Sequence, residues 1–191
     1  MIRRTFICLP LADEARSALS AVQERLHQEG YRLAYVDPDL AHLTLVFLGA
    51  TPEPVEERLV NDLAIAARSV SPFPLKLGGG GSFGSPRAPK VVWVGVEASP
   101  ALMRLQAACA DAVRATGQPV ESRPFRPHLT LARIRSRLPP GALTTIKAYI
   151  NNTPFAEFPI DRVQFMHSRL HGSGPRYNII RDFLLEGTDH G

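Results

Sequence analysis

The sequence lacks the features that mark membrane proteins and disulfide-rich secreted proteins. Charges interrupt its apolar stretches well before the roughly 18 consecutive apolar residues that a membrane-spanning helix needs, so we expect no membrane segment. It has only two cysteines, Cys8 and Cys109, which lie in apolar surroundings and form no C-x-x-C pair. We therefore predict no disulfide framework, and two reduced core cysteines in a cytoplasmic protein.

We also expect no export signal, and the sequence has no strong charge of one sign. Arg3 and Arg4 precede an apolar run that is too short for a signal-peptide core and has no small-residue cleavage site, so we interpret it as a first strand. The net charge of +4 over 191 residues suits a phosphate-bearing ligand without requiring one. With 45% hydrophobic and 21% charged residues, the chain has a globular composition and is long enough for one large domain or two small lobes.

What the sequence does contain is an internal repeat. The tetrapeptide His-Leu-Thr-Leu occurs at residues 42–45 and again, 86 residues later, at residues 128–131. The same offset places residues 4–10 on residues 90–96, and in both segments a basic residue leads into a run of β-formers. We predict equivalent strands in the two halves.

The offset also brings two helical patterns into register. Residues 13–28 and residues 99–114 both carry apolar side chains at helical spacing. Ser99 is a predicted N-cap with Pro100 in the first turn, and Asp13 is a candidate cap for the first helix. Further elements are expected after Thr51-Pro52 (a helix), after Pro139-Pro140 (a weaker helix ending near Tyr149), over residues 155–170 (strand) and over residues 176–185 (strand).

These elements predict one bilobal α+β domain over residues 1–191. Its two lobes would be related by an approximate twofold axis, each with an antiparallel sheet and outer helices. This symmetry brings the two tetrapeptides face to face across the lobe interface, where ligand clefts are common.

The repeated motif carries the groups that a phosphodiester needs. Alternation along a strand places His42 and Thr44 on one face and turns the leucines and Phe47 toward the core, and the same parity pairs His128 with Thr130. Two imidazoles, with unperturbed pKa values near 6.5, supply a general base and a general acid close to neutral pH. The two hydroxyls can donate hydrogen bonds to phosphate oxygens.

A single histidine on a strand is more often structural than catalytic, but two at equivalent positions have no obvious packing role and favour catalysis or phosphate binding. Arg133 is the candidate cation for charge that develops on the phosphate. Regular alternation puts it on the face opposite His128, so its use requires a bulge or a strand end. No carboxylate or cysteine stands at ligand spacing, so we expect no metal; zinc bound by both histidines and a third ligand is the alternative.

At this point the sequence resembles the two-histidine phosphoesterase superfamily, which is defined by paired His-x-Thr/Ser-x motifs. Within it, the chain is similar to the bacterial and archaeal RNA 2′,3′-cyclic phosphodiesterases, historically called 2′-5′ RNA ligases. The resemblance covers nearly the whole chain and rests on residues 4–7, 42–49, 83–84, 92–95, 127–133 and 168–177.

The resemblance implies a bilobal α+β fold, no cofactor or metal, and cleavage of a terminal 2′,3′-cyclic phosphate to a 2′-phosphomonoester. Members of the family also join tRNA halves through a 2′-5′ linkage. By motif match, His42 and His128 take the catalytic roles, while Thr44, Thr130 and Arg133 bind the phosphate. We prefer His42 as the acid that protonates the departing 3′ oxygen and His128 as the base that activates water.

Features outside the motifs have two interpretations each. Four glycines at residues 78–81 lack the Gly-Lys-Ser/Thr ending of a phosphate loop and are predicted to form a flexible turn at the edge of the cleft. Phe83 either stacks on a terminal base or packs in the core. Arg126 belongs to a set of loop cations that either follow the RNA strand or are solvated. Tyr177 and His171, near a glycine-rich turn, are candidates for the cleft lining.

The leading hypothesis is a monomeric, metal-independent phosphodiesterase acting on RNA ends with 2′,3′-cyclic phosphates, including tRNA fragments. The alternatives are RNA ligation by the same site, hydrolysis of a small cyclic phosphate, and a non-enzymatic module that binds RNA ends. An enzyme is favoured because binding alone would not require two titratable groups.

Overall fold

The computed structural model describes residues 1–85, 87–171 and 174–187, and its side chains are described except at residues 170, 171 and 174. The elements in chain order are β1 (Ile2–Pro10), α1 (Asp13–Gln28), β2 (Ala34–Tyr35), the short 3-10 helix η1 (Pro38–Leu40), β3 (His42–Pro52), α2 (Glu53–Arg68), β4 (Phe73–Ser85), β5 (Ala88–Val96), α3 (Pro100–Ala115), β6 (His128–Arg133), α4 (Ala142–Asn152), β7 (Glu157–Ile160), β8 (Arg162–His171) and β9 (Gly174–Leu184).

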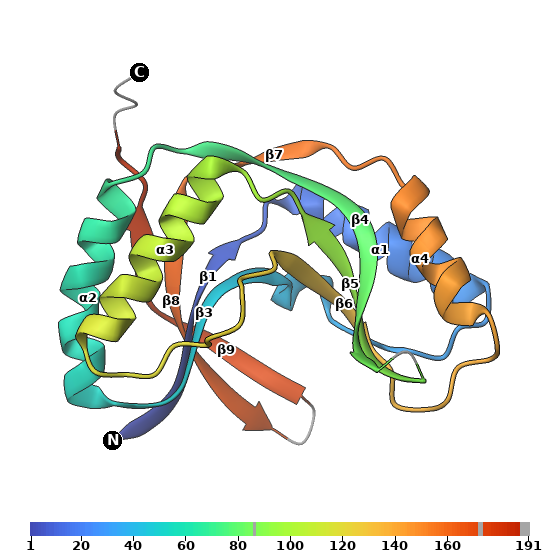
Figure 1. The fold of residues 1–191 in the computed structure, drawn as a ribbon, viewed down its shortest axis with the longest axis horizontal. Coiled ribbons are helices and arrows are strands. Elements are labelled where there is room, and N and C mark those ends of the chain that lie inside the picture. The colour runs from blue at the N-terminus through green and yellow to red at the C-terminus, as the bar shows by residue number, and fades with distance from the viewer. Residues whose placement is uncertain (86, 172–173, 188–191) are drawn as a thin grey trace.

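The strands form two antiparallel sheets, and the predicted α+β fold with two lobes is confirmed (Figure 1). The first sheet has the order β3-β1-β8-β9 and the second the order β2-β6-β5-β4-β7. The predicted strands at residues 4–10 and 90–96 are β1 and β5, and each pairs with a motif strand: β1 with β3, and β5 with β6. Each tetrapeptide therefore begins a strand, β3 or β6, and the strand beside it, β1 or β5, is the equivalent one in its half of the chain.

The lobes do not coincide with the two halves of the chain, because the first helix of each half crosses to the other sheet. Helix α3, which follows β5 of the second sheet, packs against α2 and against β3 of the first sheet. Helix α1, which follows β1 of the first sheet, lies with Ala15 and Ala18 beside Leu77 of β4 and Phe158 of β7. Figure 1 shows the resulting arrangement, with α2 and α3 on one lobe and α1 and α4 on the other.

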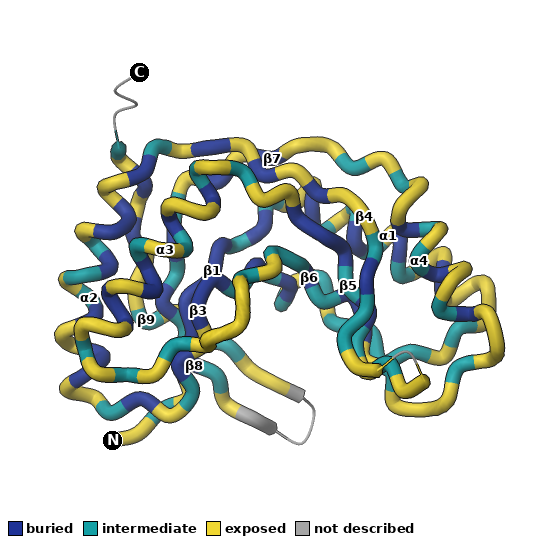
Figure 2. The backbone as a smooth tube through the Cα atoms, viewed as in Figure 1, coloured by how far each residue is buried: buried dark blue, intermediate teal, exposed yellow. Residues whose placement is uncertain are grey.

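The amphipathic patterns produce the expected buried faces. Figure 2 shows buried positions along the inner strands and on the sheet-facing sides of the helices. The residues at the predicted spacing in α1 and α3 are buried except Ala108, which is half-buried; the buried ones are Ala15, Leu19, Val22, Leu26, Leu102, Leu105 and Ala112. Cys8 and Cys109 are buried free thiols, as predicted. In the described part of the chain, no helix has the length and apolarity needed to cross a membrane.

The helix starts are only partly as predicted. Ser99 caps α3, and its hydroxyl accepts a hydrogen bond from the Leu102 N–H at 3.3 Å. Asp13 is not a cap: it is the first residue of α1, and Ala12 occupies the cap position without a side-chain hydrogen bond. The helix expected after Thr51-Pro52 is α2, in which Pro52 holds the cap position without a side-chain hydrogen bond.

The four glycines at residues 78–81 form part of strand β4, so the prediction of a flexible turn is wrong. Their role is close packing. A Cβ on Gly81 would lie 2.0 Å from the Trp93 ring, and a Cβ on Gly80 would lie 2.8 Å from Cβ of Ile150 in α4. The pairing with β5 also shifts register between Leu77 and Gly80, as glycine-containing bulges allow.

Candidate active site

The two motif strands border one open cavity of about 1030 Å³. Thr44 from β3 and His128 from β6 both line it, together with Phe47, Phe83 and Arg126. His42 lies two residues before Thr44 on the same strand, half-buried beside the cavity rather than on its wall. Residues from both copies of the motif thus contribute to one site.

Each motif histidine makes the same backbone hydrogen bond. Nδ1 of His42 lies 2.8 Å from the carbonyl oxygen of Leu40, and Nδ1 of His128 lies 2.6 Å from the carbonyl oxygen of Arg126. A carbonyl oxygen only accepts, so Nδ1 of each ring carries the hydrogen. In the neutral ring, Nε2 is therefore left with the lone pair that accepts a proton, and both imidazoles are held in the tautomer that a general base needs.

Each histidine also lies against two aromatic rings. His42 stacks on Phe6 at 4.8 Å between ring centroids and meets Tyr177 edge-on at 5.2 Å. His128 meets Phe83 edge-on at 4.7 Å and lies 5.9 Å from Trp93. These rings exclude water from one side of each imidazole and limit its rotation.

Burial changes the acidity of both histidines in the same direction. It lowers the pKa of His42 and of His128 below the ordinary value of 6.5, because the charged form loses hydration, while the hydrogen bond to the backbone carbonyl opposes the shift. Burial raises the pKa of Tyr177, and the positive charges of Arg133 and Arg4 oppose that rise. Arg133 therefore lies close enough to Tyr177, a ring that contacts His42, to influence the acidity of the tyrosine.

Both motif strands carry a β-bulge at the same position. Cys8 pairs with Thr44 and the preceding Ile7 pairs with Val46, so Leu45 is skipped. In the second sheet Trp93 pairs with Thr130 and Val92 pairs with Ala132, so Leu131 is skipped. The two skipped leucines occupy equivalent positions, so the irregularity is repeated together with the motif.

The bulges reverse the alternation beyond them. Two consecutive residues after each threonine are buried, and the next residue, Phe47 or Arg133, is exposed. The bulge that is needed to bring Arg133 to the same strand face as His128 is therefore present. The prediction that Phe47 points into the core is wrong for the same reason: its side chain is 46% exposed and lines the cavity.

A glutamine from the crossing helix reaches each skipped leucine. Nε2 of Gln23 in α1 donates to the carbonyl oxygen of Leu131 at 3.1 Å and to that of Val36 at 2.7 Å. Nε2 of Gln106 in α3 makes a longer bond, 3.5 Å, to the carbonyl oxygen of Leu45. Each bulge is thus hydrogen-bonded to a helix that follows a strand of the other sheet.

The two threonines present unused hydroxyls. Thr44 and Thr130 are half-buried on the same strand faces as the histidines. Among the described residues, neither hydroxyl has a hydrogen-bond partner in the protein. Both are therefore free to donate to an anionic ligand.

The remaining predicted residues lie at or near the same place, with one exception. Phe83 and Arg126 line the cavity and contact His128 through ring and backbone, and Tyr177 contacts His42. His171 cannot be placed, because its side chain lies outside the described residues. No group of three potential metal ligands is found in the described ranges.

Sequence reasoning missed the rings of Phe6 and Trp93 as site residues, although both lie in segments that carried the resemblance. The available signal was strand pairing: Trp93 pairs with Thr130, and Phe6 lies two residues before Cys8, which pairs with Thr44. It also missed Gln23 and Gln106, for which spacing alone gives no signal.

Comparisons with known proteins now identify the family. Residues 10–172 match the model of the 2′-5′ RNA ligase superfamily. The chain belongs to this superfamily. The resemblance predicted from the two motifs is therefore confirmed.

Members of the superfamily resemble the chain over its length. The RNA 2′,3′-cyclic phosphodiesterase of Thermus thermophilus is 32% identical over 98% of this chain and 92% of its own. That of Geobacillus stearothermophilus is 30% identical over 97% of this chain, which spans only 58% of that protein. The crystal structure of TT0787 of Thermus thermophilus superposes with a TM-score of 0.81 at 29% identity, covering 98% of this chain and all of that one.

Proposed function

We propose that the protein hydrolyses 2′,3′-cyclic phosphates at RNA ends to 2′-phosphomonoesters, with His42 and His128 as the acid and base. Its relatives in Thermus thermophilus and Thermotoga maritima are RNA 2′,3′-cyclic phosphodiesterases. The observation that carries the mechanism is the shared tautomer: both histidines donate Nδ1–H to a backbone carbonyl and keep Nε2 for proton transfer.

In the proposed reaction, a water oxygen attacks phosphorus and the bond from phosphorus to the 3′ oxygen breaks. One imidazole takes a proton from the water, and the other gives a proton to the departing 3′ oxygen. The free hydroxyls of Thr44 and Thr130 donate to the non-bridging oxygens, and Arg133 offsets the charge that accumulates on them. No step requires a metal or a cofactor.

The two environments support His128 as the base. Its ring lines the open cavity, where water has access, whereas His42 is enclosed by Phe6 and Tyr177 and lies off the cavity wall. Burial disfavours the charged form of His42, but a bound phosphodiester anion beside the ring would restore the proton that a general acid must carry. We therefore keep His42 as the acid.

The size of the cavity favours RNA over a small cyclic phosphate as substrate. A volume of about 1030 Å³ exceeds what one nucleotide fills, and Arg114, Arg123 and Arg126 line the cavity. We expect the physiological substrates to include tRNA fragments. We also expect a cytoplasmic monomer, because one chain supplies every group of the proposed site.

Ligation by the same site is the second candidate, because the matching family model describes 2′-5′ RNA ligases. In ligation a 5′ hydroxyl replaces water as the nucleophile: the base takes its proton, a new bond forms between phosphorus and the 5′ oxygen, and the acid protonates the departing 3′ oxygen, which leaves a 2′-5′ linkage. A duplication of one ancestral unit is our explanation for the repeated motif, bulge and glutamine contact.

The direct test is an oligonucleotide ending in a 2′,3′-cyclic phosphate, incubated with the protein in the presence of a chelator. We expect a 2′-phosphomonoester from the wild type and its formation at least about 10²-fold more slowly from His42→Ala or His128→Ala. A 3′-phosphomonoester would reverse the assigned leaving group. Binding without turnover of any cyclic phosphate would favour the non-enzymatic module.

A further inference from the structure

Tyr177 is a residue beside the motif histidines whose hydroxyl the proposed chemistry does not use. It is half-buried on β9, and its ring meets both His42 and Phe6 edge-on at 5.2 Å between ring centroids. No described residue forms a hydrogen bond with its hydroxyl, and the oxygen is not among the fully buried polar atoms, so a ligand can reach it. The side chain is thus held by its ring and free at its oxygen.

Two cations lie near this hydroxyl. Burial raises the pKa of Tyr177 above its ordinary value, and the positive charges of Arg133 and Arg4 oppose the rise. These arginines come from different sheets, Arg4 from β1 and Arg133 from β6, and no carboxylate in the described ranges pairs with either. Because the phenol keeps its proton at neutral pH, it can donate a hydrogen bond to an anion that these charges attract.

Strand pairing explains why the tyrosine faces the cleft. Tyr177 pairs with Ser168 of β8, and Ser168 pairs with Arg4 of β1, so the three residues form one row across the first sheet. Residues directly opposite each other point to the same face, and so does Phe6, two residues after Arg4. Phe6 stacks on His42, which places this row on the face of the sheet that carries the motif histidine.

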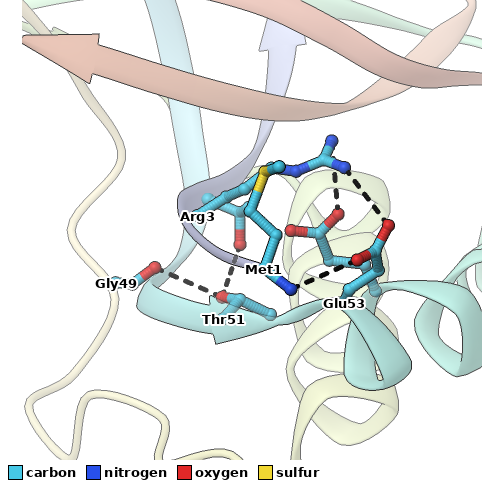
Figure 3. A network of polar contacts seen from close by, with 7 residues as sticks. Met1, Arg3, Gly49, Thr51 and Glu53 are labelled. Carbon is cyan, nitrogen blue, oxygen red and sulfur yellow. Dashed lines mark hydrogen bonds and ion pairs between the residues drawn. The ribbon is translucent and has the colours of Figure 1, made fainter.

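The strand in this row, β1, is held in place from the opposite face (Figure 3). Arg3 reaches Glu53 and Glu56 of α2 at 3.7 and 3.6 Å, and the hydroxyls of Thr5 and Thr51 share a buried hydrogen bond of 2.7 Å. Because neighbouring residues point to opposite faces, these contacts fix β1 without engaging the cleft side. The tyrosine therefore packs against a strand whose position does not depend on a ligand in the cleft.

The two motif strands supply unequal sets of donors for an anion. Each carries a threonine hydroxyl, and three residues later β6 adds Arg133, whereas the equivalent position of β3 holds Phe47, which cannot donate. We propose that the hydroxyl of Tyr177 is the missing donor of the first sheet and binds a non-bridging oxygen of the reacting phosphate together with Arg133. This inference rests on the proposed function, since it completes the phosphate site of that reaction.

Packing against an imidazole does not by itself account for a tyrosine. Phe6 stacks on His42 and Phe83 meets His128 edge-on at 4.7 Å, and neither ring carries a hydroxyl. A phenylalanine at position 177 would support His42 equally well. The hydroxyl is therefore the part of Tyr177 that calls for a ligand.

The test compares Tyr177→Phe, which keeps the ring, with the wild type on uridine 2′,3′-cyclic phosphate and on its Rp and Sp phosphorothioates. We expect kcat/KM for the oxygen ester to fall about 10-fold, the effect of losing one hydrogen bond to a charged group. Sulfur accepts hydrogen bonds weakly, so the loss should be clearly smaller for one diastereomer and remain about 10-fold for the other. Tyr149→Phe, at a half-buried tyrosine of α4 away from the cavity, is the matched control and should change no rate.

An unchanged kcat/KM in Tyr177→Phe would overturn the proposal, and so would equal losses on the two diastereomers, because the hydroxyl would then serve no particular oxygen. An NMR titration of His42 adds a second criterion. Its pKa should be the same in Tyr177→Phe as in the wild type, and a clear shift would show that the hydroxyl acts through the histidine instead.

Binding of inorganic phosphate separates this inference from the proposed function. Measured by calorimetry, the affinity should fall about 10-fold in Tyr177→Phe and stay unchanged in Tyr149→Phe. If the wild type hydrolyses no cyclic phosphate, the catalytic proposal fails, and this binding series still decides whether the hydroxyl holds an anion. Equal affinity in Tyr177→Phe and the wild type would overturn the inference alone.

Discussion

The two motif strands of this molecule repeat their chemistry and differ in their surroundings. In each strand a histidine donates Nδ1–H to the carbonyl two residues earlier, and a threonine hydroxyl has no hydrogen-bond partner within the described part of the chain. In each strand, too, a leucine is skipped by its partner strand, and a glutamine donates to the carbonyl oxygen of that leucine. The two strands of one chain thus share the features that their backbones determine.

The differences lie in side chains that meet the cavity. His128 lines it, whereas His42 is enclosed by two rings, and the residue beyond the bulge is an aromatic ring in β3 and a cation in β6. A repeated backbone places two equivalent imidazoles, and unequal side chains at equivalent positions give the two halves of the site different surroundings.

The strongest test of the comparison removes each imidazole. We expect His42→Ala and His128→Ala each to lower kcat by about 10² to 10⁴ on a 2′,3′-cyclic phosphate, the usual range for a general acid or base. His27→Ala, an exposed histidine on α1, is the matched control and should keep wild-type activity.

A substrate with a nitrophenyl leaving group sharpens this test, since such a group departs without a proton. His42→Ala should then retain most of its activity, whereas His128→Ala should remain impaired. Equal damage in both variants would remove the distinction between acid and base that their unequal surroundings suggest.

The next largest effect is expected at the unequal pair beyond the bulges. Arg133→Met should lower kcat/KM by about 10² on every cyclic phosphate, because it removes a charge aimed at the phosphate oxygens. Steady-state kinetics on a 2′,3′-cyclic phosphate measures this loss, and an unchanged kcat/KM would contradict the role of Arg133 at the phosphate.

The pH dependence follows from the lowered pKa of both histidines. In the free enzyme both rings are neutral at pH 7, and the form with one protonated ring becomes populated as pH falls below 6.5. We expect a bell-shaped profile of kcat/KM centred below pH 6.5, falling about tenfold per pH unit on each limb. The profile of kcat should lie at higher pH, because a bound phosphodiester anion raises the pKa of the proton donor. An optimum of kcat/KM above pH 7 would contradict the shared burial effect.

Much of the fold and of the candidate site could be predicted from the sequence. The features that could not be predicted have a physical reason. The helices over residues 13–28 and 99–114 were predictable because one face of each is apolar at helical spacing, and the paired tetrapeptides indicated the site. The orientation of Phe47 was mispredicted because alternation assumes a regular ladder, and a bulge is set by how two strands pair. The crossing of α1 and α3 to the opposite sheets depends on tertiary packing, which no local pattern encodes.

The glutamine contacts should give a smaller effect, and an unequal one. Gln23→Leu removes a 3.1 Å bond to the bulged Leu131 and should lower kcat a few-fold with little change in KM, because Arg133 loses its fixed direction. Gln106→Leu removes only a 3.5 Å bond and should do less. If Gln23 acts through the arginine, the double variant Gln23→Leu/Arg133→Met should be no slower than Arg133→Met alone. Additive losses would assign Gln23 a purely structural role.

The smallest effect concerns the two crossing helices, which begin differently. Ser99 caps α3 with a hydroxyl bound to the Leu102 N–H, whereas Ala12 at the start of α1 offers no side-chain acceptor. Ser99→Ala should therefore lower the free energy of unfolding by about 1 kcal/mol, and Ala12→Ser should raise it by about 0.5–1 kcal/mol, as measured by urea denaturation. Because neither position touches the cavity, kcat/KM should stay unchanged in both. A stabilising Ala12→Ser that also slowed turnover would mean that the start of α1 must yield during catalysis, so that the two lobes differ in motion as well as in side chains.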